Sequence, residues 1–286
     1  MKFKYIRNLG ASALFLGMMF ACEDLTELNE NPNGSDPSVV NPNLVMSSVL
    51  TEASKNYVNL GYGIVAGVMQ HTQKDGWFSD HNNYDWANQD WSAHYAVLLD
   101  NQLVHDRAVE LGLEFHQGVS YVVRAFVFGL VTDLWGDAPY TNALLGEKLG
   151  EYLKPTFDSQ EVIYDGILAE LETANSLLSK PNNEYEGISG DADVIYGGDA
   201  SAWRKLANSL ALRYYMRISS KKPDVAKAGI EKIAGNPSQY PIITSADEDA
   251  TMSFPGASVN SSWPNAIKFD ASESNFSRIK MCATSL

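Results

Sequence analysis

The sequence predicts a fold dominated by α-helices, and three observations support this prediction. Apolar residues recur with a period near 3.6 over most of the chain that follows residue 42. Few stretches alternate polar and apolar residues, which is the pattern of a half-buried strand. After Gly235 the chain is rich in Ser, Asn, Asp, Pro and Gly, so we expect a loop-rich C-terminal part with at most a short strand or two.

The chain opens with the pattern of a cleaved export signal. Three basic residues among the first seven precede the uncharged run 9–21, which is the order of such a signal. The run is 13 residues long, whereas a helix needs about 20 apolar residues to cross a bilayer. The run ends in Ala21-Cys22, as a lipobox does, so we expect cleavage before Cys22 and acylation of its thiol and amine. An ordinary secretory signal with an incidental cysteine is the alternative.

Three parts of the chain can be distinguished. The segment 22–43 is dense in Asn, Asp, Glu, Pro and Gly and has almost no helical periodicity, so it predicts a lipidated tether. We therefore expect a signal peptide over 1–21, the tether over 22–43 and a helical domain over 44–286. The last residues, 278–286, have the pattern of the opening turns of another helix with nothing to pack against. From this we expect the domain to be incomplete at its C-terminus.

The apolar stripes after residue 42 divide into a series of helices. They are expected at 43–58, 62–73, 88–111, 115–134, 160–179, 201–219 and 224–234. Asp158, with Glu161 three residues later, supplies a start signal for the helix over 160–179, and Asp199 or Ser201 can cap the next one. Neighbouring helices pair in the manner of helical repeats. The tetratricopeptide landmarks do not recur at the period of that repeat, so we expect only degenerate tetratricopeptide-like pairs.

Charge and motif content exclude several classes of function. The chain carries 21 Lys and Arg against 35 Asp and Glu, a net charge of −14, and a field of this sign repels nucleic acid. Two cysteines are too few for a thiolate zinc cluster. No phosphate-binding loop and no metalloprotease, serine-hydrolase or CxxC motif occurs. The five histidines fall about 11 residues apart, roughly 16 Å along a helix, too far for a shared metal ion, and no cofactor is expected.

Three aspartates gather in one Gly-rich stretch. Asp191, Asp193 and Asp199 offer the oxygen ligands that calcium prefers. They lack the spacing of an EF-hand loop, so we favour a solvated turn over a calcium site.

The segment between residues 77 and 95 combines aromatic rings with short polar side chains. Sugars offer apolar C–H faces and hydroxyl edges, so a sugar site needs flat rings beside carboxylates and amides. The candidate ligand-binding residues are Trp77, Asp80, Tyr84, Asp85, Trp86, Asn88 and Trp91. As the alternative, Trp91 and Tyr95, four residues apart, anchor the following helix in the core. Asp80 and Asp85 could serve as the acid and base of a glycosidase, but nearness in sequence does not establish that geometry.

Four motifs, in order along the chain, resemble those of the SusD/RagB family of outer-membrane lipoproteins. They are 28–33, the stretch 123–140 with the sequence VRAFVFGLVTDLWGDAPY, 155–158 and 198–213. The reading of these motifs from their residues is structural. Arg124 and Ala125 lie off the apolar stripe of their helix, Gly136 permits a sharp turn after Trp135, and Pro139 prevents the helix from resuming.

The resemblance implies a SusD-like helical fold on the cell surface of Bacteroidetes. It also implies a partner, a SusC-like TonB-dependent transporter of the outer membrane, to which such proteins hand glycans or related nutrients without cleaving them. Glu23 and Asp24, directly after Cys22, resemble the acidic export signals of surface lipoproteins in this phylum. Full members run nearly twice this length, so we expect the apolar stripe over 201–219 to lack partners.

Two functions follow as hypotheses. The first is a lipid-anchored, cell-surface protein that binds a glycan or oligosaccharide and works with the transporter in uptake, with no enzymatic activity. The second is a structural adaptor that only docks the transporter and uses its aromatic segment as a protein interface, because aromatic enrichment is equally expected there.

Overall fold

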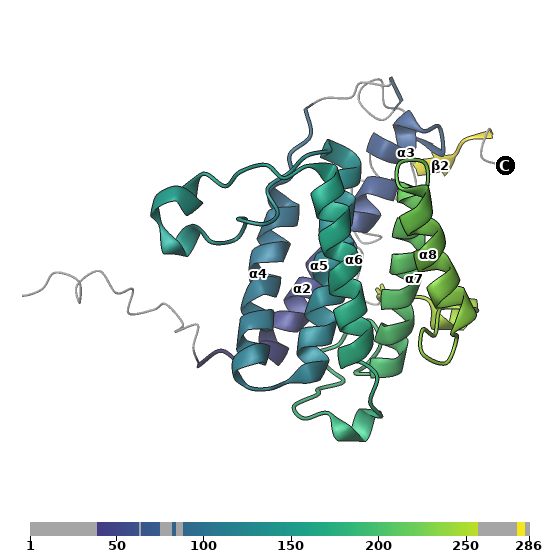
Figure 1. Ribbon diagram of the computed structural model, residues 1–286. Coiled ribbons are helices and arrows are strands. Elements are labelled where there is room, and N and C mark those ends of the chain that lie inside the picture. The colour runs from purple at the N-terminus through teal and green to yellow at the C-terminus, as the bar shows by residue number, and fades with distance from the viewer. Residues whose placement is uncertain (1–38, 63, 75–81, 84–87, 257–278, 284–286) are drawn as a thin grey trace, which may run out of the picture. The chain divides into compact units, whose positions relative to one another are not determined.

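The computed structural model describes residues 39–62, 64–74, 82–83, 88–256 and 279–283 (Figure 1). The chain divides into two units, Met1–Val40 and Asn41–Leu286, and all the elements below lie in the second. These are the helices α2 (Pro42–Tyr62), α3 (Ile64–Val68), α4 (Ser92–Glu110), α5 (Glu114–Trp135), α6 (Gln160–Leu177), α7 (Ala200–Ile218) and α8 (Pro223–Gly235), and the strands β1 (Thr72–Lys74) and β2 (Ile279–Met281). The prediction of a fold dominated by α-helices is confirmed. The predicted boundaries of the signal peptide, tether and domain stay predictions.

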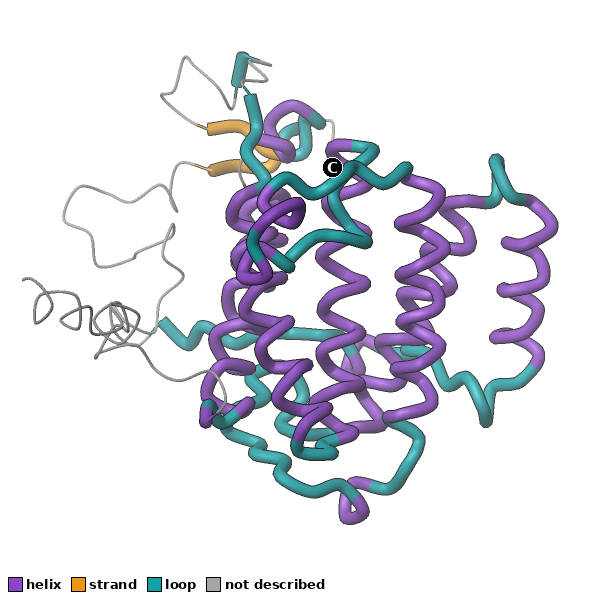
Figure 2. Tube along the Cα trace, turned by 60° about the vertical axis from the view of Figure 1, so that its left-hand side comes forward, coloured by secondary structure: helices purple, strands orange, loops and turns teal. Residues whose placement is uncertain are grey.

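The helices from α4 to α8 pack in the order in which they follow one another along the chain. Figure 1 shows them side by side, with α2 behind α4 and α5, and α2 packs mainly against α4. The turned view shows the same row of helices, with the two strands beside each other at one end (Figure 2). Helices α4 and α5, and α6 and α7, are the two predicted pairs, and each pair is in contact.

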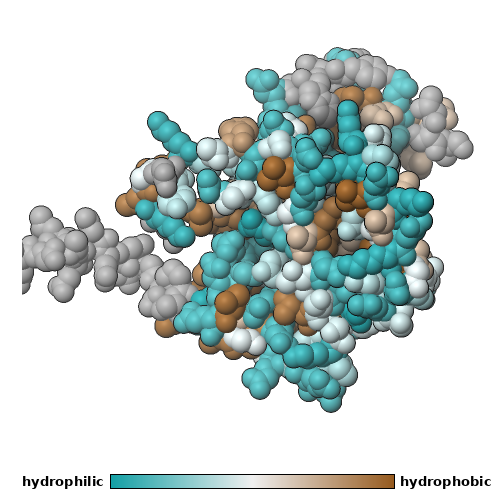
Figure 3. Space-filling model, in the orientation of Figure 1, coloured by the Kyte–Doolittle hydropathy of each residue, from teal (hydrophilic) through white to brown (hydrophobic). Residues whose placement is uncertain are grey.

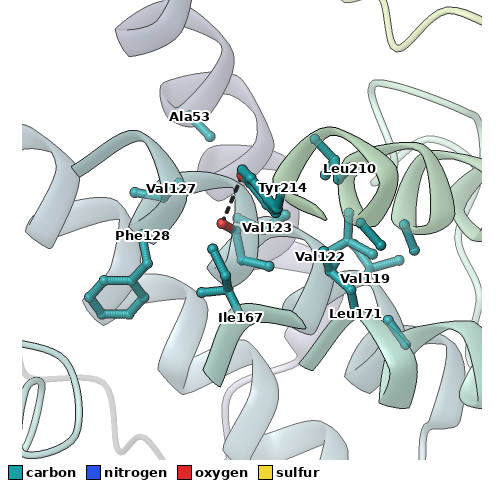
Figure 4. Close-up of a cluster of buried hydrophobic side chains, with 14 of the residues drawn as sticks. Ala53, Val119, Val122, Val123, Val127, Phe128, Ile167, Leu171, Leu210 and Tyr214 are labelled. Atoms are coloured by element: carbon teal, nitrogen blue, oxygen red, sulfur yellow. Dashed lines mark hydrogen bonds between the residues drawn. The ribbon is translucent and has the colours of Figure 1, made fainter. Parts of the chain in front are cut away.

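Helix α5 lies at the centre of the hydrophobic core. Its apolar length and composition would be sufficient to span a membrane, but α4, α6, α7 and α2 surround it and bury most of its side chains. Val119, Val122, Val123 and Phe128 are in the core, with the side chains of neighbouring helices packed around them (Figure 4). The apolarity of α5 is therefore explained by its burial.

The packing around α5 corrects one expectation from the sequence. Ala125 was expected off the apolar stripe, yet it is fully buried. The reason is that helices cover α5 on several sides, so its buried face is wider than the stripe. The Tyr214 hydroxyl from α7 reaches this face and donates a hydrogen bond to the Ala125 carbonyl at 3.1 Å (Figure 4). A Cβ at Gly129 would overlap the same hydroxyl, so only glycine permits this approach.

Arg124 leaves this apolar surface to form a polar network between α5 and α6. Its Nε donates to Glu170 Oε1 at 2.8 Å, and the Tyr140 hydroxyl donates to the same oxygen at 2.7 Å. The guanidinium lies 4.8 Å from the centre of the Phe128 ring, a cation–π distance. Burial raises the pKa of the Glu170 carboxyl, and the Arg124 charge opposes this shift. The network therefore holds a carboxylate in place that would otherwise be costly to bury.

The side chain that caps α7 was predicted from the sequence, whereas the one that caps α6 was predicted wrongly. The Asp199 carboxylate caps α7 by accepting hydrogen bonds from the backbone amides of Ser201 and Ala202, which confirms one of the two predicted caps. The side chain that caps α6 is Ser159, not Asp158. Asp158 instead accepts from the backbone amides of Tyr140 and Thr141 at 3.1 and 2.7 Å. It therefore fixes the turn after α5, a contact that local sequence patterns do not reveal.

The Gly-rich stretch with three aspartates is not a solvated turn throughout, because Asp193 is only 2% exposed. One carboxylate oxygen accepts from the amides of Ile195 and Tyr196 at 3.1 Å, and the other from the Gly198 amide at 2.8 Å and the Trp203 indole at 2.7 Å. Asp193 thus organises the loop and joins it to α7. Among the described residues, no group of three or more His, Cys, Asp or Glu side chains is placed to hold a metal ion.

A helix was expected over 278–286, but residues 279–281, which the structure describes, form the strand β2. β2 pairs antiparallel with β1, with Gln73 opposite Lys280, and the Cys282 amide donates to the His71 carbonyl at 3.0 Å. Residues far apart in sequence supply these backbone partners, which is why a local pattern misled the prediction. The expected helix over 62–73 is also different, since α2 continues to Tyr62, α3 is one short helix and β1 follows.

His116 is fully buried in α5, and its environment keeps it neutral. The Asn43 amide nitrogen donates to the Gly187 carbonyl, so its oxygen accepts from His116 Nε2, 2.9 Å away. The other ring nitrogen, Nδ1, is buried and has no hydrogen-bond partner among the described residues. Burial lowers the pKa of His116 to about 4, below the value near 6.5 of an exposed histidine.

This shift makes the stability of the fold depend on pH. Between about pH 6.5 and 4, the unfolded chain binds a proton that the folded chain does not, so stability falls as the pH falls through this window. We expect His116 to lower the free energy of unfolding by about 2 kcal/mol at pH 5 relative to pH 8. The free energy of unfolding of His116→Gln, measured in urea, should lack this part of the pH dependence. His71→Gln, a change at an exposed histidine, should retain it. Identical pH profiles for the parent and His116→Gln would contradict the prediction.

Candidate functional site

The structure describes two of the residues that were predicted to bind ligand. Asn88 is exposed and Trp91 is half-buried, and both precede α4 in extended or irregular backbone. The helix that was predicted over 88–111 therefore begins four residues later than predicted. Cys22, Trp77, Asp80, Tyr84, Asp85 and Trp86 lie outside the described residues, so their assignment stays a prediction.

Trp91 is part of a group of rings drawn from three segments of the chain. Its ring centre lies 5.6 Å from Tyr95, 6.0 Å from Trp135 and 5.7 Å from Phe157. These separations and the tilted or edge-to-face angles are those at which aromatic side chains attract one another. We call Trp91, Tyr95, Trp135 and Phe157 the ring cluster.

The first turn of α4 holds one side of the ring cluster. Asp90 accepts from the Ser92 amide at 2.8 Å and from its hydroxyl at 2.7 Å, which fixes the chain on either side of Trp91. These hydrogen bonds lower the pKa of Asp90, so its carboxylate is charged at neutral pH. The Tyr95 hydroxyl donates to the Pro139 carbonyl at 2.6 Å, and burial together with the charge of Asp158 raises its pKa to about 12. Tyr95 is therefore a neutral hydrogen-bond donor at any physiological pH.

The turn after α5 holds the other side. Gly136 ends α5 with a positive φ of 78°, a conformation that favours glycine, and its carbonyl accepts from the Thr132 hydroxyl at 2.8 Å. Ala138 and Asp158 then form an isolated antiparallel bridge, with hydrogen bonds of 3.1 and 3.0 Å. This bridge positions Phe157 beside Trp91.

The exposed part of the ring cluster offers what a sugar ring requires. The Phe157 side chain is 61% exposed, and Trp91 and Trp135 are each half-buried, so apolar ring surface faces water. Exposed Asn88 and the Asp90 carboxylate adjoin it in sequence and supply hydrogen-bonding groups. Flat apolar faces next to such groups can stack on the C–H faces of a sugar and bind its hydroxyls.

Trp135 and Phe157 were not among the predicted ligand residues. Both lie within motifs that were interpreted as determinants of the fold. Their sequence positions are far from Trp91, so only the tertiary contacts bring the three rings together. The alternative role of Trp91 and Tyr95 as anchors of α4 fits Tyr95 better, because Tyr95 also packs edge-to-face on the buried Phe128 ring.

A separate groove of about 420 Å³ lies between α2, α5 and α7. Apart from Ser54 and Arg213, its lining is made of apolar or aromatic side chains, among them Tyr57, Phe126 and Leu206. By contrast, hydrophilic residues predominate on the face shown in Figure 3, where apolar ones form small separate groups. The groove has few polar groups that could bind the hydroxyls of a sugar, and so the ring cluster is the better candidate for a glycan site.

Comparison with known proteins relates this fold to a family. The model of the family described as "Starch-binding associating with outer membrane" matches residues 34–284. A SusD homologue of Bacteroides fragilis superposes with a TM-score of 0.67 at 23% identity, over 86% of this chain and 49% of that one. A Bacteroides vulgatus protein, described as a proposed outer membrane protein for nutrient binding, gives 0.68 at 27% identity, over 86% and 50%.

Further comparisons agree on the fold. A chitin-binding protein superposes with a TM-score of 0.58 at 25% identity, over 76% of this chain and 46% of that one. The chain thus spans about half the length of the solved chains that it matches. No curated protein sequence matches it. Since the family model covers most of the sequence and the helical fold agrees, the chain belongs to this SusD-like family.

Proposed function

We propose that the protein binds a glycan or oligosaccharide at the cell surface, using the ring cluster, and delivers it to a SusC-like TonB-dependent transporter. The observation that carries this proposal is the half-exposed group of rings, which Asn88 and Asp90 closely precede in sequence at Trp91. The description of the family as starch-binding and the name of the chitin-binding relative support a polysaccharide ligand. We propose binding without cleavage, as the family resemblance implies.

The predicted segment before α4 extends this proposal. Trp77 and Trp86 stand close to Trp91 in sequence, and we propose that they add ring surface to the same site. In the competing proposal the protein is an adaptor that contacts only other proteins. The exposed Phe157 ring is compatible with that role too, because aromatic side chains are enriched in protein interfaces.

Affinity electrophoresis in gels that contain soluble starch or a water-soluble chitin derivative distinguishes the two proposals. We expect the parent protein to be retarded in at least one gel, and Phe157→Ala and Trp91→Ala to weaken binding about 5- to 10-fold through loss of roughly 1 kcal/mol of stacking each. Phe157 is mostly exposed, so its removal should leave the melting temperature almost unchanged. Leu99→Ala, a change at an apolar residue of α4 outside the cluster that is 50% exposed, is the matched control and should bind as the parent does.

The outcomes separate the roles of the individual rings. Weaker retardation of Trp77→Ala and Trp86→Ala would place the preceding segment in the site. An adaptor predicts no retardation of the parent on any polysaccharide, and that result would remove the glycan proposal. Release of reducing sugar from a retained polysaccharide would instead contradict binding without cleavage.

Anchoring to the outer membrane through Cys22 is the remaining part of the proposal. We expect labelled palmitate to be incorporated into the chain in cells, and the label to be lost in Cys22→Ser, because the thiol is the acceptor of the first lipid group. Intact cells should leave the anchored protein open to added protease. Normal labelling of Cys22→Ser, or full protection from the protease, would contradict an acylated cell-surface protein.

A further inference from the structure

The exposed rings of the ring cluster each have an aspartate close to them in the sequence. These aspartates are Asp90, Asp137 and Asp158, which lie one or two positions from Trp91, Trp135 and Phe157 respectively. We call the three aspartates the flanking carboxylates. None of them forms an ion pair with any residue that the structure describes. The ring cluster therefore has negative charges next to its rings along the chain, and no cation is paired with them.

Hydrogen bonds hold the flanking carboxylates in place and leave their charge intact. Asp137 accepts from the Gln160 amide at 2.9 Å. Asp90 and Asp158 also accept from backbone amides. These donors are neutral, so they favour the charged form of a carboxylate without cancelling its charge. The charge of Asp158 acts on the ring cluster itself, because it adds to the effect of burial in raising the pKa of the Tyr95 hydroxyl to about 12.

The basic side chains nearest to the ring cluster do not neutralise this charge. The His94 ring lies 5.6 Å from the Trp135 ring, but burial lowers the pKa of His94, so it carries no charge near neutral pH. The loop that leads to Phe157 carries Lys148 and Lys154, and neither forms an ion pair with a described carboxylate. Negative charge therefore predominates around the rings.

The sequence that leads to Trp91 adds charge of the same sign. Residues 75–91 contain the four aspartates Asp75, Asp80, Asp85 and Asp90, and no lysine or arginine. The whole chain carries a net charge of −14. A surface with charge of one sign attracts ligands of the opposite sign and repels those of its own.

A sugar that carries a protonated amine fits both the rings and the carboxylates. An ammonium group is attracted by the face of an aromatic ring, and it is attracted by a carboxylate at short range. A neutral sugar can stack on the rings and form hydrogen bonds, but it gains nothing from the charge. A sugar that carries a carboxylate or sulfate brings a like charge to the same place, which opposes its binding.

We propose that the ring cluster is selective for glycans with free amino groups, which it binds more tightly than neutral glycans of the same linkage, and that it rejects anionic glycans. This proposal rests on the glycan-binding function proposed above and names the class of sugar. Asp90 and Asp137 are the residues that determine the selectivity, because both are exposed and adjoin the rings in sequence. Asp158 is less available, since it already accepts from two amides and a hydroxyl of the turn after α5.

Titration calorimetry of the purified protein with three tetrasaccharides tests this selectivity. The first is β-1,4-linked glucosamine, the second is its N-acetylated counterpart and the third is galacturonate. At about pH 6 the amines are protonated and the carboxylates are charged. We expect the glucosamine tetramer to bind about 5-fold more tightly than the N-acetylated one, and the galacturonate tetramer not to bind. In about 1 M salt the preference for the amine should largely disappear, because charges are then screened beyond about 3 Å.

Substitution of the carboxylates assigns the preference to the ring cluster. We expect Asp90→Asn and Asp137→Asn each to reduce the preference for the amine to about 2-fold or less. An asparagine side chain keeps a carbonyl that can accept from the backbone amide, so both variants should fold. Asp191→Asn, a change at an exposed carboxylate of the loop before α7, is the matched control and should keep the full preference. Tetralysine, which has the charge without the sugar, should bind more weakly than the glucosamine tetramer.

Three results would overturn the proposal. They are equal binding of the glucosamine and N-acetylated tetramers, an unchanged preference in both variants, and binding of tetralysine as tight as that of the glucosamine tetramer. If one variant does not fold, the preference measured for the other decides. Retardation of the protein by starch or the chitin derivative, without a preference for the amine, would remove the selectivity and leave glycan binding in place. Absence of binding to every glycan would remove both proposals.

Discussion

Replacement of Asp193 by Asn is expected to lower the free energy of unfolding by about 4 kcal/mol. The two carboxylate oxygens each accept two hydrogen bonds, from three backbone amides and the Trp203 indole. An amide side chain has one oxygen, so in either orientation its NH2 group faces two of these donors. Two buried donors then lose their acceptor, and each costs about 1–3 kcal/mol.

The measurement is urea unfolding followed by circular dichroism. Asp191→Asn is the matched control, because Asp191 lies in the same loop but is exposed, and its replacement should change stability by less than about 0.5 kcal/mol. Tryptophan fluorescence should also change in Asp193→Asn alone, since the Trp203 indole loses its partner. If the two variants were equally stable, the loop would not depend on the buried carboxylate.

Replacement of Arg124 by Leu is expected to destabilise the fold by about 3 kcal/mol near neutral pH. The change removes the positive charge beside Glu170 and leaves that carboxyl largely buried, with only the Tyr140 hydroxyl as donor. Burial already raises the pKa of Glu170, and without Arg124 it rises further. The folded state then binds a proton that the unfolded state releases, so stability falls as the pH rises through this range.

The loss in Arg124→Leu should therefore be larger at pH 8 than at pH 5. The double variant Arg124→Leu with Glu170→Gln should recover part of the stability at pH 8, because no buried charge remains. Arg217→Leu is the matched control: Arg217 pairs with Asp133 at 2.8 Å but is half exposed, so its replacement should cost less than about 1 kcal/mol. A pH-independent loss in Arg124→Leu would show that the arginine acts by packing alone.

Much of the fold could be predicted because the spacing of apolar residues along the sequence indicates where helices form. The period of apolar residues located the helices that became α4 to α8 to within a few residues, and the motif around Gly136 identified both the family and the turn. Ala125 was misplaced because the width of a buried face depends on how many neighbours surround a helix. Asp193 and Asp158 were misjudged because their partners are backbone amides that folding brings to them.

The candidate site could be predicted only in part. Trp91 was identified from the density of aromatic and polar residues around it. Trp135 and Phe157 join it through the end of α5 and the bridge between Ala138 and Asp158, which no periodicity encodes. The strand β2 was missed for the same reason, since its partner is near the other end of the domain.

The order of the helices also determines how far a local disturbance travels. From α4 to α8 each helix packs mainly against the helices that precede and follow it in the chain, as in helical repeat proteins. Fraying of α8 would first loosen α7 and α6, which it contacts directly, and would reach Trp135 at the end of α5 only through them. The rings of Trp91, Tyr95 and Trp135 therefore respond to the last helix only indirectly, and a ligand bound to them would stay in place during small openings of α8.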